Sequence, residues 1–77
     1  PQGVYDIHDV YNVYPNPVNN ILYIQSPINI ETVIYNSLGQ VVVSSTKEKR
    51  IDMTHLPDGI YNVVINHISC KCLRNKQ

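Results

Sequence analysis

The chain has 77 residues with six basic and six acidic side chains, so its formal net charge at pH 7 is zero. A chain of this length forms one small domain, and without an overall field it does not attract nucleic acid or an anionic membrane. Hydrophobic residues make up 43% and charged residues only 16%, which predicts a folded module and argues against a disordered tail. No window approaches the roughly 18 apolar residues of a membrane span. We expect no nucleic-acid partner, no direct membrane insertion and no cofactor.

The first half of the chain predicts short strands separated by turn residues. The range 1–9 mixes Pro, Gly, Asp and His with isolated apolar residues, as linkers do. Alternating apolar residues then predict strands over Val10–Tyr14, Ile21–Gln25 and Ile28–Tyr35. Pro15 and Pro17 end the first strand, because proline fixes φ and removes a ladder donor. On the second strand, Leu22 and Ile24 share one face.

The second half continues the pattern. The range 36–39 reads Asn-Ser-Leu-Gly and predicts a turn, because Asn can start an Asx bend and Gly accepts a positive φ. The range 44–50 is polar and is expected to be an exposed loop. A Leu-Pro-Asp-Gly turn at 56–59 precedes a strongly β-prone run whose Tyr, Val and Ile share one face. The strands expected here are Val41–Val43, Ile51–Met53, Ile60–Asn66 and Ser69–Leu73.

These elements predict an all-β fold. No window combines apolar residues at helical spacing with a cap at each end, so the helix content should be near zero. About seven short, mainly antiparallel strands, spaced about 8 to 12 residues apart, predict an immunoglobulin-like β-sandwich. Closure of the same strands into a barrel is the alternative. The absence of Trp and of well-spaced cysteines excludes the antibody-type pattern.

The two cysteines, Cys70 and Cys72, lie two apart on the last expected strand. Residues at this spacing point the same way with Cα atoms near the upper limit for a disulfide, so an internal bond would need a distorted backbone. We expect buried thiols, with an intermolecular disulfide in an oxidising compartment as the alternative. A zinc site that includes His67 is disfavoured, because it lacks a fourth ligand. No metal site is predicted.

A catalytic site finds little support. Asp52, His55 and Asp58 lie close in sequence, but no Ser or Cys nucleophile occupies a recognisable elbow, and a small domain offers little room for a cleft. We interpret the segment as a capped turn with one exposed His. The asparagines at 16, 19 and 20 have no carboxylate among them, so a solvated turn is favoured over calcium binding.

Three motifs occur in order along the chain: Tyr-Pro-Asn-Pro at 14–17, Ile-Tyr-Asn-Ser-Leu-Gly-Gln-Val-Val at 34–42, and Leu-Pro-Asp-Gly-Ile-Tyr-Asn-Val-Val-Ile at 56–65. With this spacing, the range 10–73 resembles the type A C-terminal sorting domain of cargo proteins of the type IX (Por) secretion system. The last strand departs from the family's usual pattern of Lys with Val or Ile, since it reads Ser-Cys-Lys-Cys-Leu-Arg at 69–74. This departure leaves the register of that strand open.

The resemblance implies a secretion signal at the end of a larger exported protein. In this family the type IX translocon of Bacteroidetes-type bacteria passes the N-terminal cargo domain from the periplasm across the outer membrane, to the cell surface or the medium. A sortase-like peptidase then typically removes the signal. On this interpretation, 1–9 is a linker that holds or follows the cleavage site and 10–77 is the sorting domain. The chain itself is not an enzyme, although its cargo could be one. Its first residue is Pro1 and its single Met is internal, as we expect of a fragment or a processed product.

The motif residues are expected to serve folding more than receptor contact. They are Pro15, Asn16, Pro17, Tyr35, Gly39, Leu56, Pro57, Gly59, Tyr61, Val63 and Ile65. The prolines limit lateral pairing, the glycines permit turns, and Leu56 with the three alternating residues of the last motif fills the core. The candidates for translocon recognition are basic residues near the end of the chain: Lys71, Arg74 and Lys76. An exposed last strand could add to a partner's sheet, and an unpaired edge could also join two copies into a dimer.

The alternative function is an immunoglobulin-like accessory or adhesion module that binds carbohydrate or protein. A sugar-binding module needs an exposed aromatic platform, so several tyrosines on one face would favour it. The candidates are Tyr5, Tyr11, Tyr14, Tyr23 and Tyr35.

Overall fold

The computed structural model describes residues 11–75, so the expected linker at 1–9 and Lys76 lie outside the described residues. The described part holds seven strands and no helix. They are β1 (Asn12–Tyr14), β2 (Ile21–Gln25), β3 (Glu31–Tyr35), β4 (Val41–Thr46), β5 (Arg50–Asp52), β6 (Gly59–Ile65) and β7 (Ile68–Arg74). Every paired neighbour is antiparallel. Within residues 11–75, no helix is long and apolar enough to cross a membrane.

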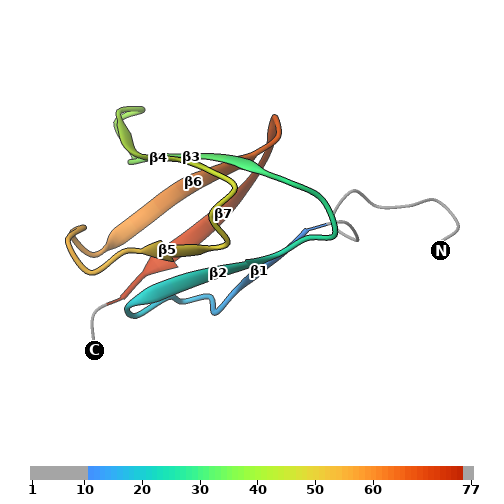
Figure 1. Cartoon of the computed structure of the whole chain (residues 1–77). Coiled ribbons are helices and arrows are strands. Elements are labelled where there is room, and N and C mark those ends of the chain that lie inside the picture. Colours follow the sequence, from blue (N-terminus) through green and yellow to red (C-terminus); the bar gives the residue numbers. More distant parts are fainter. Residues whose placement is uncertain (1–10, 76–77) are drawn as a thin grey trace, which may run out of the picture.

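The strands form two sheets that pack against each other (Figure 1). One sheet has the order β1-β2-β5 and the other the order β4-β3-β6-β7. No ladder joins the sheets in the described part of the chain, where an isolated parallel bridge connects Val18 to Arg74. The prediction of an all-β sandwich is therefore confirmed, and the barrel alternative is wrong.

Strand alternation builds the core between the sheets. On β2, Leu22 and Ile24 are buried, as their spacing predicts. The four core residues expected from the last motif, Leu56, Tyr61, Val63 and Ile65, are buried too. Other core members come from connections and short strands, which local alternation does not reveal. They include Val18, Ile30, Ile51 and Met53.

Two strands differ from their predicted bounds by three residues at one end, whereas the differences elsewhere are of one or two residues. β3 begins at Glu31 and not at Ile28, because the Ile28 amide donates to Ser26 Oγ in a turn and the Ile28 side chain stays exposed. β4 continues through the polar residues Ser44, Ser45 and Thr46, which pair with β3. The expected loop at 44–50 is therefore shorter, because pairing with a central strand outweighs the low hydrophobicity of these residues.

The hairpins at the two ends of the larger sheet follow from their turn residues. Asn36 Oδ1 accepts hydrogen bonds from the amides of Leu38 and Gln40, both at 2.9 Å, which is the predicted Asx bend. Gly39 has a φ of +83° with no atom near the position of a Cβ, so the turn needs its backbone freedom and not its small size. Between β6 and β7, Asn66 and His67 both adopt positive φ, as a two-residue type I′ turn requires.

Candidate recognition surface

β7 is an edge strand, and its register shows which backbone groups face away from the sheet. Ile65 and Ile68 flank the two-residue turn and pair directly, so hydrogen bonds to β6 recur at every second residue from Ile68. Ser69, Lys71 and Leu73 therefore direct their amides and carbonyls outward. The register runs without a break to Gly59 opposite Arg74, which settles the register that the sequence left open.

The Tyr-Pro-Asn-Pro segment covers part of this edge. Asn16 Nδ2 donates to the Lys71 carbonyl at 3.3 Å, and Asn16 Oδ1 accepts from the Leu73 amide at 3.0 Å. Next along the chain, the Val18 amide donates to the Leu73 carbonyl at 2.8 Å and the Val18 carbonyl accepts from Asn75 at 2.9 Å. We call the edge from the Lys71 carbonyl to Asn75 the covered half. The Asn16 side chain thus makes the hydrogen bonds that the backbone of a neighbouring strand would make. Val18 takes part in the same pairing but lies outside the three motifs.

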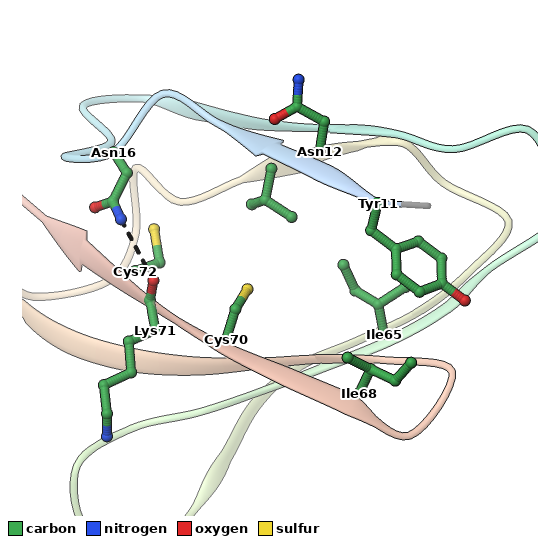
Figure 2. A pocket seen from close by; sticks show the side chains of 9 residues that line it. Tyr11, Asn12, Asn16, Ile65, Ile68, Cys70, Lys71 and Cys72 are labelled. Carbon is green, nitrogen blue, oxygen red and sulfur yellow. Dashed lines mark hydrogen bonds between the residues drawn. The ribbon is translucent and has the colours of Figure 1, made fainter. Parts of the chain in front are cut away.

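A cavity of about 280 Å³ lies beside the rest of the edge, between β1 and β7 (Figure 2). Its apolar lining comes from both sheets and includes Val13, Ile65, Ile68 and Cys70, with Asn12 and Asn16 among its polar residues. Cys70 and Cys72 point into this space, whereas the Lys71 side chain points away from it (Figure 2). We call the cavity, together with the outward groups of Ser69 and the Lys71 amide, the β1–β7 groove.

The three basic residues proposed for recognition have different environments. Lys71 is exposed, as expected, and Lys76 lies outside the described residues. Arg74, which we expected at an exposed strand end, is only 1% exposed. This expectation was wrong because β7 extends one residue past Leu73, and alternation then directs Arg74 inward on the face of Cys72.

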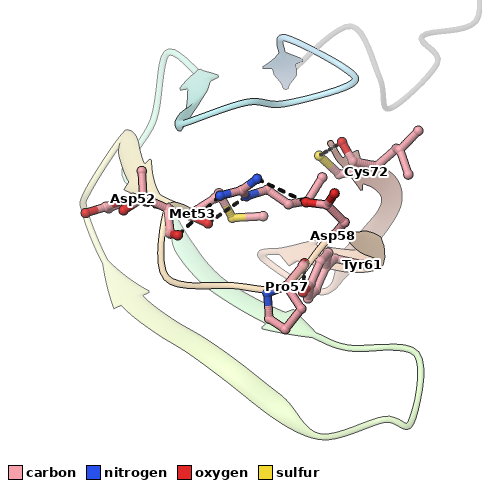
Figure 3. A network of polar contacts seen from close by, with 9 residues as sticks. Asp52, Met53, Pro57, Asp58, Tyr61 and Cys72 are labelled. Atoms are coloured by element: carbon pink, nitrogen blue, oxygen red, sulfur yellow. Dashed lines mark hydrogen bonds and ion pairs between the residues drawn. The ribbon is translucent and has the colours of Figure 1, made fainter. Parts of the chain in front are cut away.

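The Arg74 guanidinium is held by the turn between β5 and β6, whose residues Met53 and Asp58 are labelled in Figure 3. Its Nε donates to the Met53 carbonyl at 2.8 Å and a terminal nitrogen donates to the Thr54 carbonyl at 3.2 Å. The other terminal nitrogen forms an ion pair with Asp58 at 3.3 Å. A buried cation is tolerated because these acceptors replace its hydration. The residue therefore joins the last strand to the Leu-Pro-Asp-Gly turn.

The same turn is capped from within. Asp52 Oδ1 accepts from the Thr54 hydroxyl and from the Thr54 amide, and these two bonds lower the pKa of the Asp52 carboxyl. At the other end, the Tyr61 hydroxyl donates to the Pro57 carbonyl (Figure 3). His55 is exposed. The interpretation of this segment as a capped turn with an exposed histidine is confirmed.

The cysteines are free thiols. Cys72 is fully buried, and burial with the nearby Cys70 raises its pKa to about 11. Cys70 is half-buried, and burial raises its pKa as well. Both groups are therefore protonated at neutral pH. The expectation of buried thiols holds for Cys72 and only partly for Cys70. In residues 11–75, no group of three potential metal ligands comes together.

Two of the candidate tyrosines lie side by side on β1 and β2. The rings of Tyr14 and Tyr23 stack at a centroid distance of 5.6 Å, and the Arg50 guanidinium lies 5.9 Å from the centre of the Tyr23 ring. The stacking turns their faces toward each other, whereas a sugar platform needs open ring faces. The Tyr11 hydroxyl accepts a hydrogen bond from Asn66, Tyr35 lies in the other sheet, and Tyr5 lies outside the described residues. The geometry does not favour a carbohydrate site.

These features define a small β-sandwich domain whose motif residues cover part of an edge, form turns and fill the core. A family model described as the secretion system C-terminal sorting domain matches residues 12–74. The chain belongs to this family, and it is a C-terminal sorting domain of the type IX secretion system. No curated protein and no solved structure gives a significant match.

Membership of the family defines the role of the domain at a coarse level. It is a sorting signal for export across the outer membrane, to the cell surface or the medium. Such a signal interacts with the type IX machinery and is attached to an N-terminal cargo.

Proposed function

We propose that the range 10–77 is a sorting signal that is sufficient to direct its cargo through the type IX translocon and that contributes no catalytic step. The observation that carries this proposal is the family match, which spans all seven strands. A sortase-like peptidase then cuts in or before 1–9, where a linker would leave the backbone accessible. The folded sandwich supports this location, because a compact body resists cleavage better than a linker does.

Recognition is assigned to two cations near the end of the chain: Lys71, which is exposed on the last strand, and Lys76, which lies outside the described residues. Arg74 has a different part, since its guanidinium is already bound by the turn at Met53 and Thr54. It supports the strand that presents Lys71, and a direct contact with the translocon would first require it to leave that turn.

A fusion tests the sorting signal. An inert periplasmic reporter joined to residues 1–77 should reach the surface of a host that has the secretion system, and should stay in the periplasm when the translocon is deleted. A matched fusion that lacks residues 69–77 should also be retained. Retention of the complete fusion in the intact host would refute the proposal. The new C-terminus of the released reporter, determined by mass spectrometry, locates the cut.

A further inference from the structure

We propose that the β1–β7 groove is the docking site for an extended segment of a partner protein, which adds as a strand to Ser69 and Lys71 and places an apolar side chain in the cavity. The inference rests on the proposed function, because the partner is then a component of the export machinery. Three observations carry it: an unpaired length of edge, a cavity beside it and an exposed cation on the opposite face.

The unpaired edge is the first observation. Within residues 11–75, the outward amide and carbonyl of Ser69 and the Lys71 amide have no hydrogen-bond partner, whereas the covered half is bonded by Asn16 and Val18. Unpaired groups on an edge strand form a template for an added strand. Val18 shows that β7 accepts a parallel neighbour on this side. An incoming segment would extend that line of pairing toward Ile68.

The cavity is the second observation. Its volume of about 280 Å³ falls just below the range of about 300 to 1,000 Å³ that is typical of small-molecule sites. Val13, Ile65 and Cys70 contribute apolar surface to a lining that also contains Asn12 and Asn16. A cavity of this size and lining, open along a strand edge, suits an anchoring aliphatic or aromatic side chain that follows the backbone of an added strand.

The charge beside the edge is the third observation. Lys71 points to the outer side of β7, away from the cavity (Figure 2). A strand that pairs here alternates between these two sides, so its inward residues should be apolar and one outward residue should be acidic to match Lys71.

A second copy of this chain fits less well. Antiparallel pairing of two such edges about Cys70 would place the two Lys71 residues diagonally on one face, about 7–8 Å apart, where like charges repel. The groove therefore points to a different, acidic partner.

Proline substitutions on two edges provide the main test. Ser69→Pro removes an outward amide and adds bulk on the open edge, while the bonds from Ile68 and Cys70 to β6 remain. The matched control is Ser44→Pro on the β4 edge. The Lys47 amide donates to the Ile30 carbonyl, so in the β3–β4 register Ser45 faces β3 and Ser44 faces outward. Both variants are made in the reporter fusion and in the chain of residues 1–77.

Ser69→Pro should lower surface delivery by about tenfold. This is the loss expected when the partner strand loses one hydrogen bond to β7 and can no longer approach its edge closely. Ser44→Pro should deliver normally. Two further variants keep the test valid if Ser69→Pro unfolds: Lys71→Glu reverses the exposed charge, and Cys70→Phe fills the cavity. Both should reduce delivery while thermal unfolding shows a folded domain.

The remaining outcomes each decide something. Normal delivery by folded Ser69→Pro overturns the proposal that the groove is a docking site, and leaves the sorting function intact. If the proline variant unfolds, normal delivery by both Lys71→Glu and Cys70→Phe has the same meaning. Equal loss in Ser69→Pro and Ser44→Pro also overturns it, because the effect is then not specific to β7. A dimer of the wild-type chain in sedimentation that Ser69→Pro makes monomeric identifies a second copy as the occupant. Retention of the wild-type fusion refutes the sorting function and the partner assigned here with it.

Discussion

At the scale of single residues, Arg74 shows how a charged side chain can be structural in a small domain. Its three polar contacts lie on one turn, and two of them are backbone carbonyls. The carboxylate of Asp58 is 57% exposed, so the ion pair itself contributes little. Most of the stabilisation should come from the bonds to Met53 and Thr54, because unsatisfied carbonyls at a buried site are costly.

Arg74→Met should therefore lower the free energy of unfolding by about 2–4 kcal/mol, because it leaves the Met53 and Thr54 carbonyls without their donors. Arg74→Lys should lose less stability than Arg74→Met, because an ammonium still donates to some of the three acceptors, although it cannot reach them all as a guanidinium does. The control, Asp58→Asn, should change stability by less than about 1 kcal/mol. Urea unfolding of the three variants measures these differences. A fully stable Arg74→Met variant that fails to export would instead support direct recognition.

At the scale of elements, the Asn of the Tyr-Pro-Asn-Pro motif acts on a strand from the far end of the chain. Asn16 Nδ2 donates to the Lys71 carbonyl and Asn16 Oδ1 accepts from the Leu73 amide, so one side chain satisfies two backbone groups of an edge strand. An edge that is covered in this way is a poorer template for unwanted pairing. The motif therefore limits which part of β7 can receive a partner.

Asn16→Ala should free the Leu73 amide and speed its hydrogen exchange, with a loss of about 1 kcal/mol in the free energy of unfolding. Asn12→Ala is the matched control, because Asn12 is also exposed but makes only a 3.4 Å side-chain bond to Gln25. Its substitution should leave the Leu73 amide protected. Exchange measured by NMR for each amide separates the two variants. Unchanged protection of Leu73 in Asn16→Ala would mean that Val18 alone holds this edge.

The elements were also what the sequence predicted best. Alternation located the β2 and β6 core residues, and Asn36 with Gly39 predicted its turn, because these signals are local. The extension of β4 through Thr46 was missed because pairing with β3 outweighs the polarity of the added residues. Alternation along β7 could have predicted that Arg74 is buried, because it lies two residues after Cys72 and shares its face. The acceptors of Arg74 and the β1–β7 groove depend on contacts between distant segments, which no local pattern encodes.

At the scale of the whole molecule, residues from both sheets meet in one small core, and Cys72 lies within it. Its thiol is fully buried, and its pKa is raised to about 11 because burial and the nearby Cys70 disfavour the thiolate. In the unfolded chain the same thiol titrates near its ordinary value of 9.0. The pH dependence of folding therefore reports on the integrity of the core.

The sign follows from proton binding. Between pH 9 and pH 11 the folded state keeps the Cys72 proton and the unfolded state loses it, so the unfolded state binds fewer protons and the free energy of unfolding falls as pH rises. The Cys72 contribution is fully present below pH 9 and is lost as pH rises through 11, with a slope of at most about 1.4 kcal/mol per pH unit.

Urea unfolding of the wild type at a series of pH values from 7 to 11 measures this slope. Cys72→Ala removes the titrating group and leaves a small cavity, so it should be less stable at pH 7 but should lose less stability as pH rises. Burial also raises the pKa of Tyr61, and this group remains in the variant, so the difference between the two curves isolates the thiol. Parallel curves for the two proteins would show that Cys72 is accessible to solvent and that the sheets do not close over it.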